Sequence, residues 1–208
     1  PIAGETYAYD RVGNIVSRRD HTGKETTFVY DKLYRLLEVR EAGILTEQYS
    51  YDKVGNVLTA LVGGETTVYT YDNAHRLATE TTGGVVTSYE YDGSGRLSGK
   101  TTNSLLTQYL YTGDHRLGKV ELPGGSSVSY EYDASGKLLA RTSGATRTDY
   151  LLDRDNTYAD YSGGTRTAFY MRGTEVDELV GILPSGGAAT YVHQDRLNSV
   201  LATSGSFG

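Results

Sequence analysis

Short segments with alternating side chains recur along this chain, and glycine-rich stretches separate them. Val68 and Thr70 fall on one face of an extended segment and Tyr69 and Tyr71 on the other, because successive strand residues point to opposite faces. Each segment is about 6 to 8 residues long, a usual strand length. The nearest helix candidate, residues 173–183, has weak helical spacing, and we expect a strand or an irregular insertion there. The pattern predicts an all-β protein.

A motif of two tyrosines and an aspartate recurs at intervals of 20 or 21 residues. A fixed internal period is the signature of a repeat architecture. We expect the second tyrosine and the aspartate to be the structural positions of each repeat, and in the sixth repeat a threonine replaces the aspartate. These positions are Tyr9 and Asp10, Tyr30 and Asp31, Tyr51 and Asp52, Tyr71 and Asp72, Tyr91 and Asp92, Tyr111, and Tyr132 and Asp133.

Every repeat carries two turn signals. The first begins at the aspartate, whose side chain can bond the backbone two residues on, and continues with a residue that tolerates positive φ. That residue is usually glycine, and His75 and His115 occupy the same position and are expected to be turn residues. The second turn is glycine-rich, as at Gly63 and Gly64. Two turns define two strands per repeat, so we predict a repetitive array of antiparallel β-hairpins.

The regularity of the repeat changes along the chain. Residues 1–149 carry regular repeats, whereas residues 150–208 keep the spacing of about twenty only through Tyr150, Tyr170 and Tyr191. We expect one continuous array across both parts. The first residue is not methionine, and we interpret the chain as a piece of a longer polypeptide.

Composition narrows the possible chemistry. The chain has 19 tyrosines, three phenylalanines and no tryptophan or cysteine, so buried tyrosine hydroxyls need hydrogen-bond partners and thiol chemistry is excluded. The net charge of −6 and the lack of a basic cluster argue against nucleic acid. No apolar run reaches the length of a membrane span, so membrane insertion is not expected.

The unit Tyr-x-Tyr-Asp-x-x-Gly-(Asn/Arg)-Leu resembles the repeat of the YD/RHS family, which includes bacterial RHS and wall-associated toxins, the C component of Tc toxins and the teneurins. The segment from Tyr191 to Ser199 is similar to the end of RHS cores, with Asn198 where that pattern has glycine. The resemblance implies a curved or spiralling antiparallel sheet that forms part of a β-shell. No Asp-Pro pair, the site of self-cleavage in toxin members, occurs in this chain.

Candidate catalytic and metal-binding groups have simpler structural interpretations. The regular aspartates could suggest the paired carboxylates of a glycosidase, but one aspartate per turn is what backbone bonding requires. Residues 153–156 resemble a calcium loop without its glycine and distal glutamate. His193 and Asp195 form the one suggestive His-Asp pair, and no nucleophile is placed beside them. We therefore predict no enzyme activity, no catalytic residues, no cofactor and no metal.

The tyrosines have two possible uses. Stacked in register, the repeats would align them into ladders of aromatic cross-strand neighbours, each pair contributing about 0.2 to 1 kcal/mol. Tyr69, Tyr89 and Tyr109 could instead present ring faces to a glycan. The leading hypothesis is a structural section of an RHS-type shell in a secreted or cell-surface protein, with the rest of a longer polypeptide or further copies of itself as partners. The alternative is a carbohydrate-binding or self-assembling surface protein whose unpaired strand edges recruit further chains.

Overall fold

The computed structural model describes residues 4–153, 156–173, 178–194 and 200–205. These residues form twenty β-strands and no helix, which confirms the all-β prediction. The described part of the chain therefore contains no helix able to cross a membrane. Internal contacts divide the chain into two units, Pro1–Leu106 and Thr107–Gly208, and each is described by itself.

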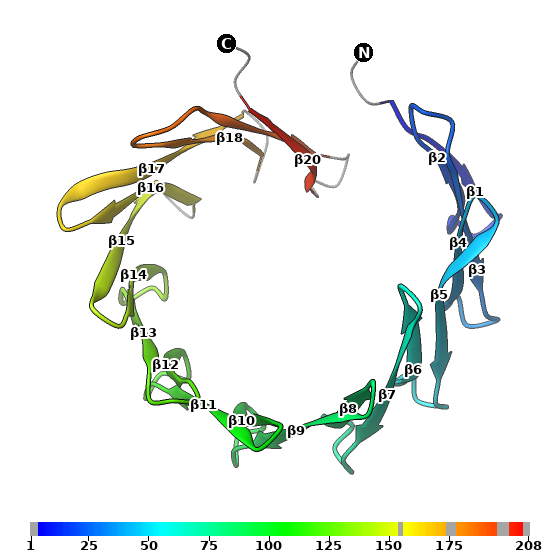
Figure 1. Cartoon of the computed structure of the whole chain (residues 1–208), viewed down its shortest axis with the longest axis horizontal. Coiled ribbons are helices and arrows are strands. Elements are labelled where there is room, and N and C mark those ends of the chain that lie inside the picture. The colour runs from blue at the N-terminus through cyan, green and yellow to red at the C-terminus, as the bar shows by residue number, and fades with distance from the viewer. Residues whose placement is uncertain (1–3, 154–155, 174–177, 195–199, 206–208) are drawn as a thin grey trace. The chain divides into compact units, whose positions relative to one another are not determined.

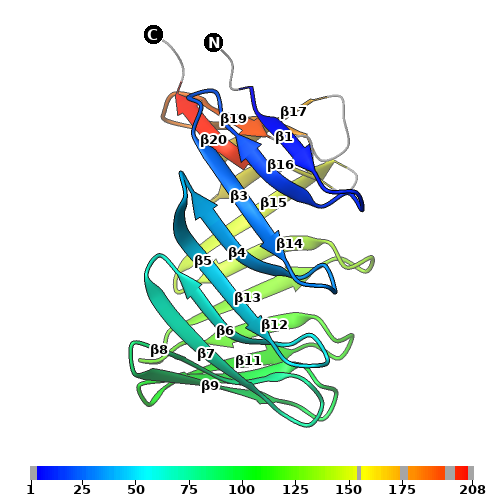
Figure 2. The same ribbon diagram turned by 90° about the vertical axis from the view of Figure 1, so that its right-hand side faces the viewer.

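The first unit is a single curved layer of antiparallel strands, each paired with the next in chain order (Figure 1). Figure 2 shows strands of this unit side by side, with their turns at two opposite edges. The strands are β1 (Thr6–Tyr9), β2 (Ile15–Arg19), β3 (Glu25–Tyr30), β4 (Leu36–Glu41), β5 (Ile44–Tyr51), β6 (Val57–Val62), β7 (Glu65–Tyr71), β8 (Leu77–Thr82), β9 (Val85–Tyr91) and β10 (Leu97–Thr102).

The second unit follows the same plan. The boundary between the units falls inside β11 (Leu105–Tyr111), and from this strand onward each strand again pairs antiparallel with the next. The other strands are β12 (Leu117–Glu121), β13 (Ser127–Tyr132), β14 (Leu138–Ser143), β15 (Thr146–Asp153), β16 (Asn156–Ser162), β17 (Thr165–Arg172), β18 (Leu179–Pro184), β19 (Thr190–Gln194) and β20 (Val200–Gly205). Within residues 173–183, where we expect a strand or an irregular insertion, β18 begins at Leu179, and residues 174–177 lie outside the described ranges.

Strand register confirms which side chains share a face and corrects one prediction. Tyr69 lies opposite Glu80, and Tyr71 lies opposite Leu77 after a bulge. Because the tyrosine-bearing strands alternate with strands of other composition, tyrosines of successive repeats are two strands apart. The predicted ladder of aromatic neighbours on adjacent strands is therefore wrong. The second, glycine-rich turn of each repeat is the reason, because it places another strand between the tyrosine-bearing ones. We call the face that carries Tyr69 and Tyr71 the tyrosine face.

Little of either unit is fully buried, because each sheet is a single layer. In the described part of the chain the buried apolar residues are Val39, Ala60, Ala140 and Ala159, and no large side chain is fully enclosed. Val39 and Ala60 belong to the tyrosine face, where they lie opposite Phe28 and Tyr49. A hydrophobic core of the usual kind cannot hold such a sheet together, so contacts between successive repeats must contribute a large share of its stability.

Candidate functional site: the inter-repeat network

The aspartate closes the turn that follows each tyrosine-bearing strand. In the third repeat the carboxylate Oδ1 of Asp52 accepts hydrogen bonds from the backbone amides of Val54 at 2.9 Å and Asn56 at 2.8 Å. The backbone amide of Asp52 donates to the carbonyl oxygen of Asn56 at 2.9 Å. Gly55 completes this turn with a φ of 106°. The prediction that aspartate bonds the backbone two residues on is confirmed, and the amide four residues on is a second donor.

The residue four positions after the aspartate holds the other carboxylate oxygen. Asn56 Nδ2 donates to Asp52 Oδ2 at 2.8 Å, and Arg35 Nε donates to Asp31 Oδ2 at 2.7 Å. Arg76 and Asp72 make the same contact at 2.8 Å. Hydrogen bonds from the Arg76 backbone and side chain lower the pKa of Asp72, since they stabilise its charged form. Each turn that has the aspartate thus contains an ionised carboxylate that organises several donors.

The second tyrosine joins its repeat to the preceding one. Tyr51 donates its hydroxyl hydrogen to the carbonyl oxygen of Leu36 at 2.7 Å, and Tyr71 donates to that of Val57 at 2.8 Å. Tyr30, Tyr91 and Tyr132 make the equivalent bonds at 2.9 Å. The acceptor is always the aliphatic residue that follows the Asn or Arg of the preceding turn. Burial raises the pKa of Tyr51, so its hydroxyl stays a donor to a higher pH than that of a free tyrosine.

Where the fourth position is arginine, its side chain also reaches the next repeat. The guanidinium of Arg35 lies 4.5 Å from the ring centroid of Tyr51, and its Nη1 donates to the carbonyl oxygen of Asp52 at 3.0 Å. Arg76 lies at the same distance over the ring of Tyr91. A cation over an exposed aromatic ring contributes about 0.5 to 1 kcal/mol. We call the second tyrosine, the aspartate and the Asn or Arg of each repeat the inter-repeat network.

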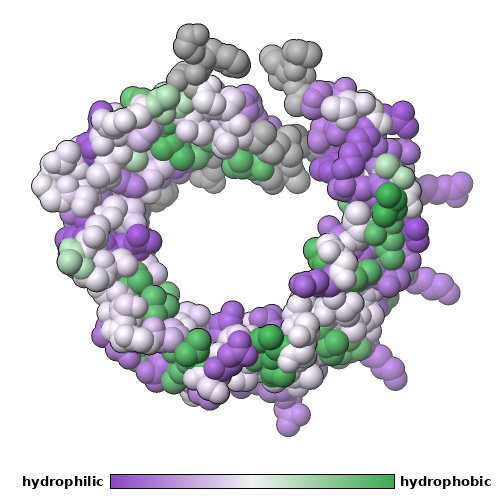
Figure 3. Space-filling view, in the orientation of Figure 1, coloured by the Kyte–Doolittle hydropathy of each residue, from purple (hydrophilic) through white to green (hydrophobic). Residues whose placement is uncertain are grey.

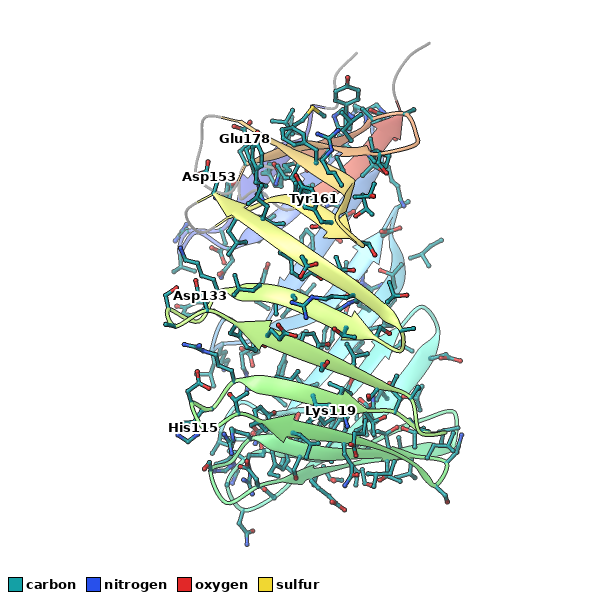
Figure 4. All side chains as sticks on the ribbon, turned by 90° about the vertical axis from the view of Figure 1, so that its left-hand side faces the viewer. His115, Lys119, Asp133, Asp153, Tyr161 and Glu178 are labelled. Atoms are coloured by element: carbon teal, nitrogen blue, oxygen red, sulfur yellow. The ribbon has the colours of Figure 1, made fainter. Side chains whose placement is uncertain are left out.

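The sixth repeat departs from this network because Thr112 replaces the aspartate. The hydroxyl of Thr112 accepts from the amide of Arg116 at 3.1 Å, but it offers no carboxylate to the guanidinium. Arg116 instead pairs with the exposed Asp114 at 2.8 Å and lies 5.7 Å from the ring of Tyr132. An open depression of about 420 Å³ lies beside Thr112 and Arg116. Figure 4 shows His115 and Asp133 at one edge of the second unit's sheet, while Lys119 lies within a strand.

The three tyrosines predicted to face a glycan are the first tyrosines of their repeats. Tyr69 and Tyr89 lie on the tyrosine face of the first unit, and Tyr109 belongs to the second unit. Tyr89 donates its hydroxyl hydrogen to Glu80 at 2.7 Å, and the ammonium of Lys100 lies 5.6 Å from its ring centroid. All three rings are half-buried. Glycan contact by these rings stays a prediction.

The structure describes only some of the residues considered as candidates for catalysis and metal binding. His193 Nε2 lies 2.9 Å from the hydroxyl oxygen of Ser204, on an exposed part of β19 and β20, and Asp195 lies outside the described residues. Asp153 ends β15, and the next two residues of the proposed calcium loop, 154 and 155, also lie outside them. Across residues 4–153, 156–173, 178–194 and 200–205, no group of three or more His, Asp or Glu side chains is arranged to hold a metal ion.

Sequence reasoning missed two parts of the network. It assigned the aspartate to its turn and the two histidines to positive-φ positions, which the φ values of 60° for His75 and 68° for His115 confirm. It gave no role to the Asn or Arg four residues after the aspartate, although that constant spacing was a usable signal. The partner of the tyrosine hydroxyl was not predictable, because the acceptor carbonyl lies 14 or 15 residues away in sequence.

Comparisons with known proteins agree with this geometry. A family model described as Teneurin YD-shell matches residues 36–143, and one described as RHS Repeat matches residues 9–43. A search of curated protein sequences finds no match. Among solved structures, a Photorhabdus luminescens Tc holotoxin pore with a substituted TccC3 superposes with a TM-score of 0.62 at 15% identity, covering 96% of this chain and 13% of that one. The crystal structure of TcdB2-TccC3-TEV gives a TM-score of 0.63 at 15% identity, covering 96% of this chain and 13% of that one. The crystal structure of TcdB2-TccC3 without the hypervariable C-terminal region gives 0.63 at 14% identity, covering 97% of this chain and 13% of that one.

The repeated hairpin, its aspartate turn and its tyrosine bond define a β-sheet protein of the YD/RHS-repeat class. The chain belongs to the teneurin YD-shell family, whose model covers more than half of it. It spans about 13% of the length of the solved Tc toxin chains, whose likeness, at 14 to 15% identity, concerns the fold.

Proposed function

We propose that the chain is a section of the wall of a YD-repeat shell, with a structural and not a catalytic role. The observation that carries the proposal is the inter-repeat network, in which the same tyrosine bond recurs between successive repeats. In the regular turns the aspartate carboxylate accepts hydrogen bonds from the backbone of its own turn, which is a structural use of this side chain. Each further repeat of such an array extends the sheet by two strands, and no central hydrophobic core is required.

The proposed setting is a longer secreted or cell-surface polypeptide. The chain spans only about 13% of its solved structural relatives, and those relatives are Tc toxin components. Its outer strand β1 has one described neighbour, β2, and β20 has one, β19. The rest of a longer RHS-type chain would supply further strands at such edges.

Limited proteolysis of the longer polypeptide tests the proposal. Asp52 and Asp72 are replaced together by alanine, which removes the carboxylates from two neighbouring turns. If this section is a wall, segments that are resistant in the unaltered protein become cleavable in the variant. A matched control replaces Asn73 and Ser94, exposed residues of two neighbouring aspartate turns, by alanine and should leave the resistance unchanged. Hydrogen exchange shows whether the sheet has opened in the aspartate variant. If it has opened and the variant is still cleaved no more than the unaltered protein, a wall role is contradicted.

A further inference from the structure

The turns of the first unit form two edges of different character. The Asp-turn rim consists of turns 10–14, 31–35 and 52–56, which join β1 to β2, β3 to β4 and β5 to β6. The Gly-turn rim consists of turns 20–24, 41–44 and 62–65 at the opposite ends of the same strands. Figure 3 shows hydrophilic side chains that stand clear of the sheet on the right-hand side, where Figure 1 places this unit.

Each turn of the Asp-turn rim presents a cation followed by an apolar side chain. The cations are Arg11, Lys32 and Lys53, and all three are exposed. The apolar residues that follow them are also exposed, by 59% at Val12, 66% at Leu33 and 65% at Val54. None of the three cations forms an ion pair with a residue that the structure describes. Later Asp-turns of the unit, at residues 73–75 and 93–95, have neither a cation nor a large apolar residue at these positions.

The carboxylates of this rim are already engaged. Asp10 and Asp52 accept bonds from turn amides and from Asn14 and Asn56, and Asp31 pairs with Arg35. The rim therefore carries four cations against three carboxylates, a net charge of +1, and its projecting charges are the positive ones. Charges of this kind, exposed and without partners, favour a partner of opposite sign.

The Gly-turn rim has the complementary character. It carries Asp20, Glu41 and Glu65 against the one cation Lys24, a net charge of −2. Lys24 pairs with Glu41, and Asp20 accepts hydrogen bonds from the amides of its own turn, so Glu65 is the carboxylate of this rim without such a contact among the described residues. Its exposed apolar residues are Ile44 and Val62, at 71% and 50%. Both rims belong to the same strands, so turns on either rim recur every second strand, a spacing of about 9 to 10 Å. A partner with the same period can match every turn at once, and a second copy of this sheet has that period.

We propose that the Asp-turn rim of the first unit binds the Gly-turn rim of a second copy of this chain. The contact places Arg11, Lys32 and Lys53 against the acidic turns of the other copy and buries the apolar residues beside them. It is a heterologous contact, because two different surfaces meet, so each bound copy still offers one free rim and the association is open-ended. The contact is made by the turns and not by the strand edges, and it is open to a wall section whether or not the wall encloses anything.

Sedimentation velocity of the purified chain tests the contact. We expect the weight-average sedimentation coefficient to rise with protein concentration at low ionic strength and to fall when salt screens the rims. The triple variant Arg11→Glu, Lys32→Glu, Lys53→Glu should associate at least about tenfold more weakly, since three attractions become repulsions. A variant with the same change in net charge outside both rims, Lys119→Glu, Arg141→Glu, Arg166→Glu, is the control and should associate normally. Circular dichroism checks that each variant is folded.

A charge swap makes the test independent of any loss of folding. The double variant Glu41→Lys, Glu65→Lys should fail to associate alone, as should the triple variant. An equal mixture of the two should associate, because each acidic rim then meets a basic one. A single species that does not change with concentration up to about 1 mM overturns the proposal, since specific contacts are stronger than that. Undiminished association of the triple variant overturns it as well. Binding of the unaltered chain to phosphatidylserine vesicles without self-association overturns it in favour of a membrane surface.

Discussion

The hydroxyl of Tyr71 donates a hydrogen bond of 2.8 Å to the carbonyl oxygen of Val57, the first residue of the neighbouring strand β6. The bond ties one repeat to the turn of the preceding one. Replacing Tyr71 by phenylalanine keeps the ring and removes the donor, so we expect the free energy of unfolding to fall by about 0.5 to 1.5 kcal/mol. Urea denaturation followed by circular dichroism measures the change.

Tyr69 provides the matched control for this substitution. It lies two residues earlier on the same face of β7, and its hydroxyl makes no hydrogen bond with the residues that the structure describes. The change Tyr69→Phe should alter the free energy of unfolding by less than about 0.5 kcal/mol, as for a surface position. Equal losses at both positions would show that the tyrosine hydroxyls act in some way other than the bond to Val57.

The sixth repeat offers the opposite experiment, a gain of stability. Thr112→Asp restores the carboxylate that Arg35 and Arg76 have in their own turns. We expect Arg116 to leave Asp114 for the new carboxylate, and the free energy of unfolding to rise by about 0.5 to 1.5 kcal/mol. Thermal denaturation measures this gain. The same substitution in an Arg116→Ala background should gain less, and an equal gain in both backgrounds would contradict the role given to Arg116.

The sequence predicts the strands well because their signals are local. The alternation around Tyr69 and Tyr71 sets the face, and the Asp72 turn sets where the strand ends, and neither depends on distant residues. The aromatic ladder failed although the sequence indicates two strands per repeat, because the second strand, with Glu80 opposite Tyr69, lies between the tyrosines of successive repeats.

The candidate site is less predictable than the fold because it is made between repeats. The bond of Tyr51 to Leu36 depends on how far β5 extends past the start of β4. The register between β4 and β5 sets that offset, and it shifts from Arg40 opposite Leu45 to Val39 opposite Glu47. Nothing in a single repeat indicates such a shift, so a structure is needed to find the acceptor.

A strained turn predicts a second way to stabilise the chain. Ala42 has a φ of 47°, in the left-handed region that disfavours residues with a Cβ atom, and Gly43 follows it between β4 and β5. Ala42→Gly should raise the free energy of unfolding by about 0.5 to 1 kcal/mol, as the relief of strain exceeds the entropy that glycine loses. Ala60→Gly, at a buried strand position, is the control and should lower it by about 1 kcal/mol. Chemical denaturation of both variants decides the sign.

The turn carboxylates make the fold sensitive to acid. Hydrogen bonds from the backbone and side chain of Arg76 lower the pKa of Asp72 in the folded state. A lowered folded-state pKa gives stability that is present above the unfolded value of about 3.9 and is lost as pH falls through the folded-state pKa. We expect unfolding midpoints in urea to drop below about pH 4. In Asp72→Asn the drop should be smaller, and an identical pH profile would show that Asp72 does not contribute to it.

Alkaline conditions should act through Tyr49. Its hydroxyl donates to the carboxylate of Glu47, and this bond, together with burial, raises the pKa of Tyr49 to about 12. A raised folded-state pKa gives stability that is complete below the unfolded value of about 10 and is lost as pH rises toward 12. Urea denaturation between these values should show a falling free energy of unfolding, with a shallower slope for Tyr49→Phe. Ultraviolet titration of the phenolate absorbance gives a second readout, because the pKa values of Tyr49 and Tyr170 are both raised to about 12 and the folded chain should therefore have fewer ionised tyrosines near pH 11 than the unfolded chain. Simultaneous ionisation of all tyrosines near pH 10 in the folded protein would contradict both raised pKa values.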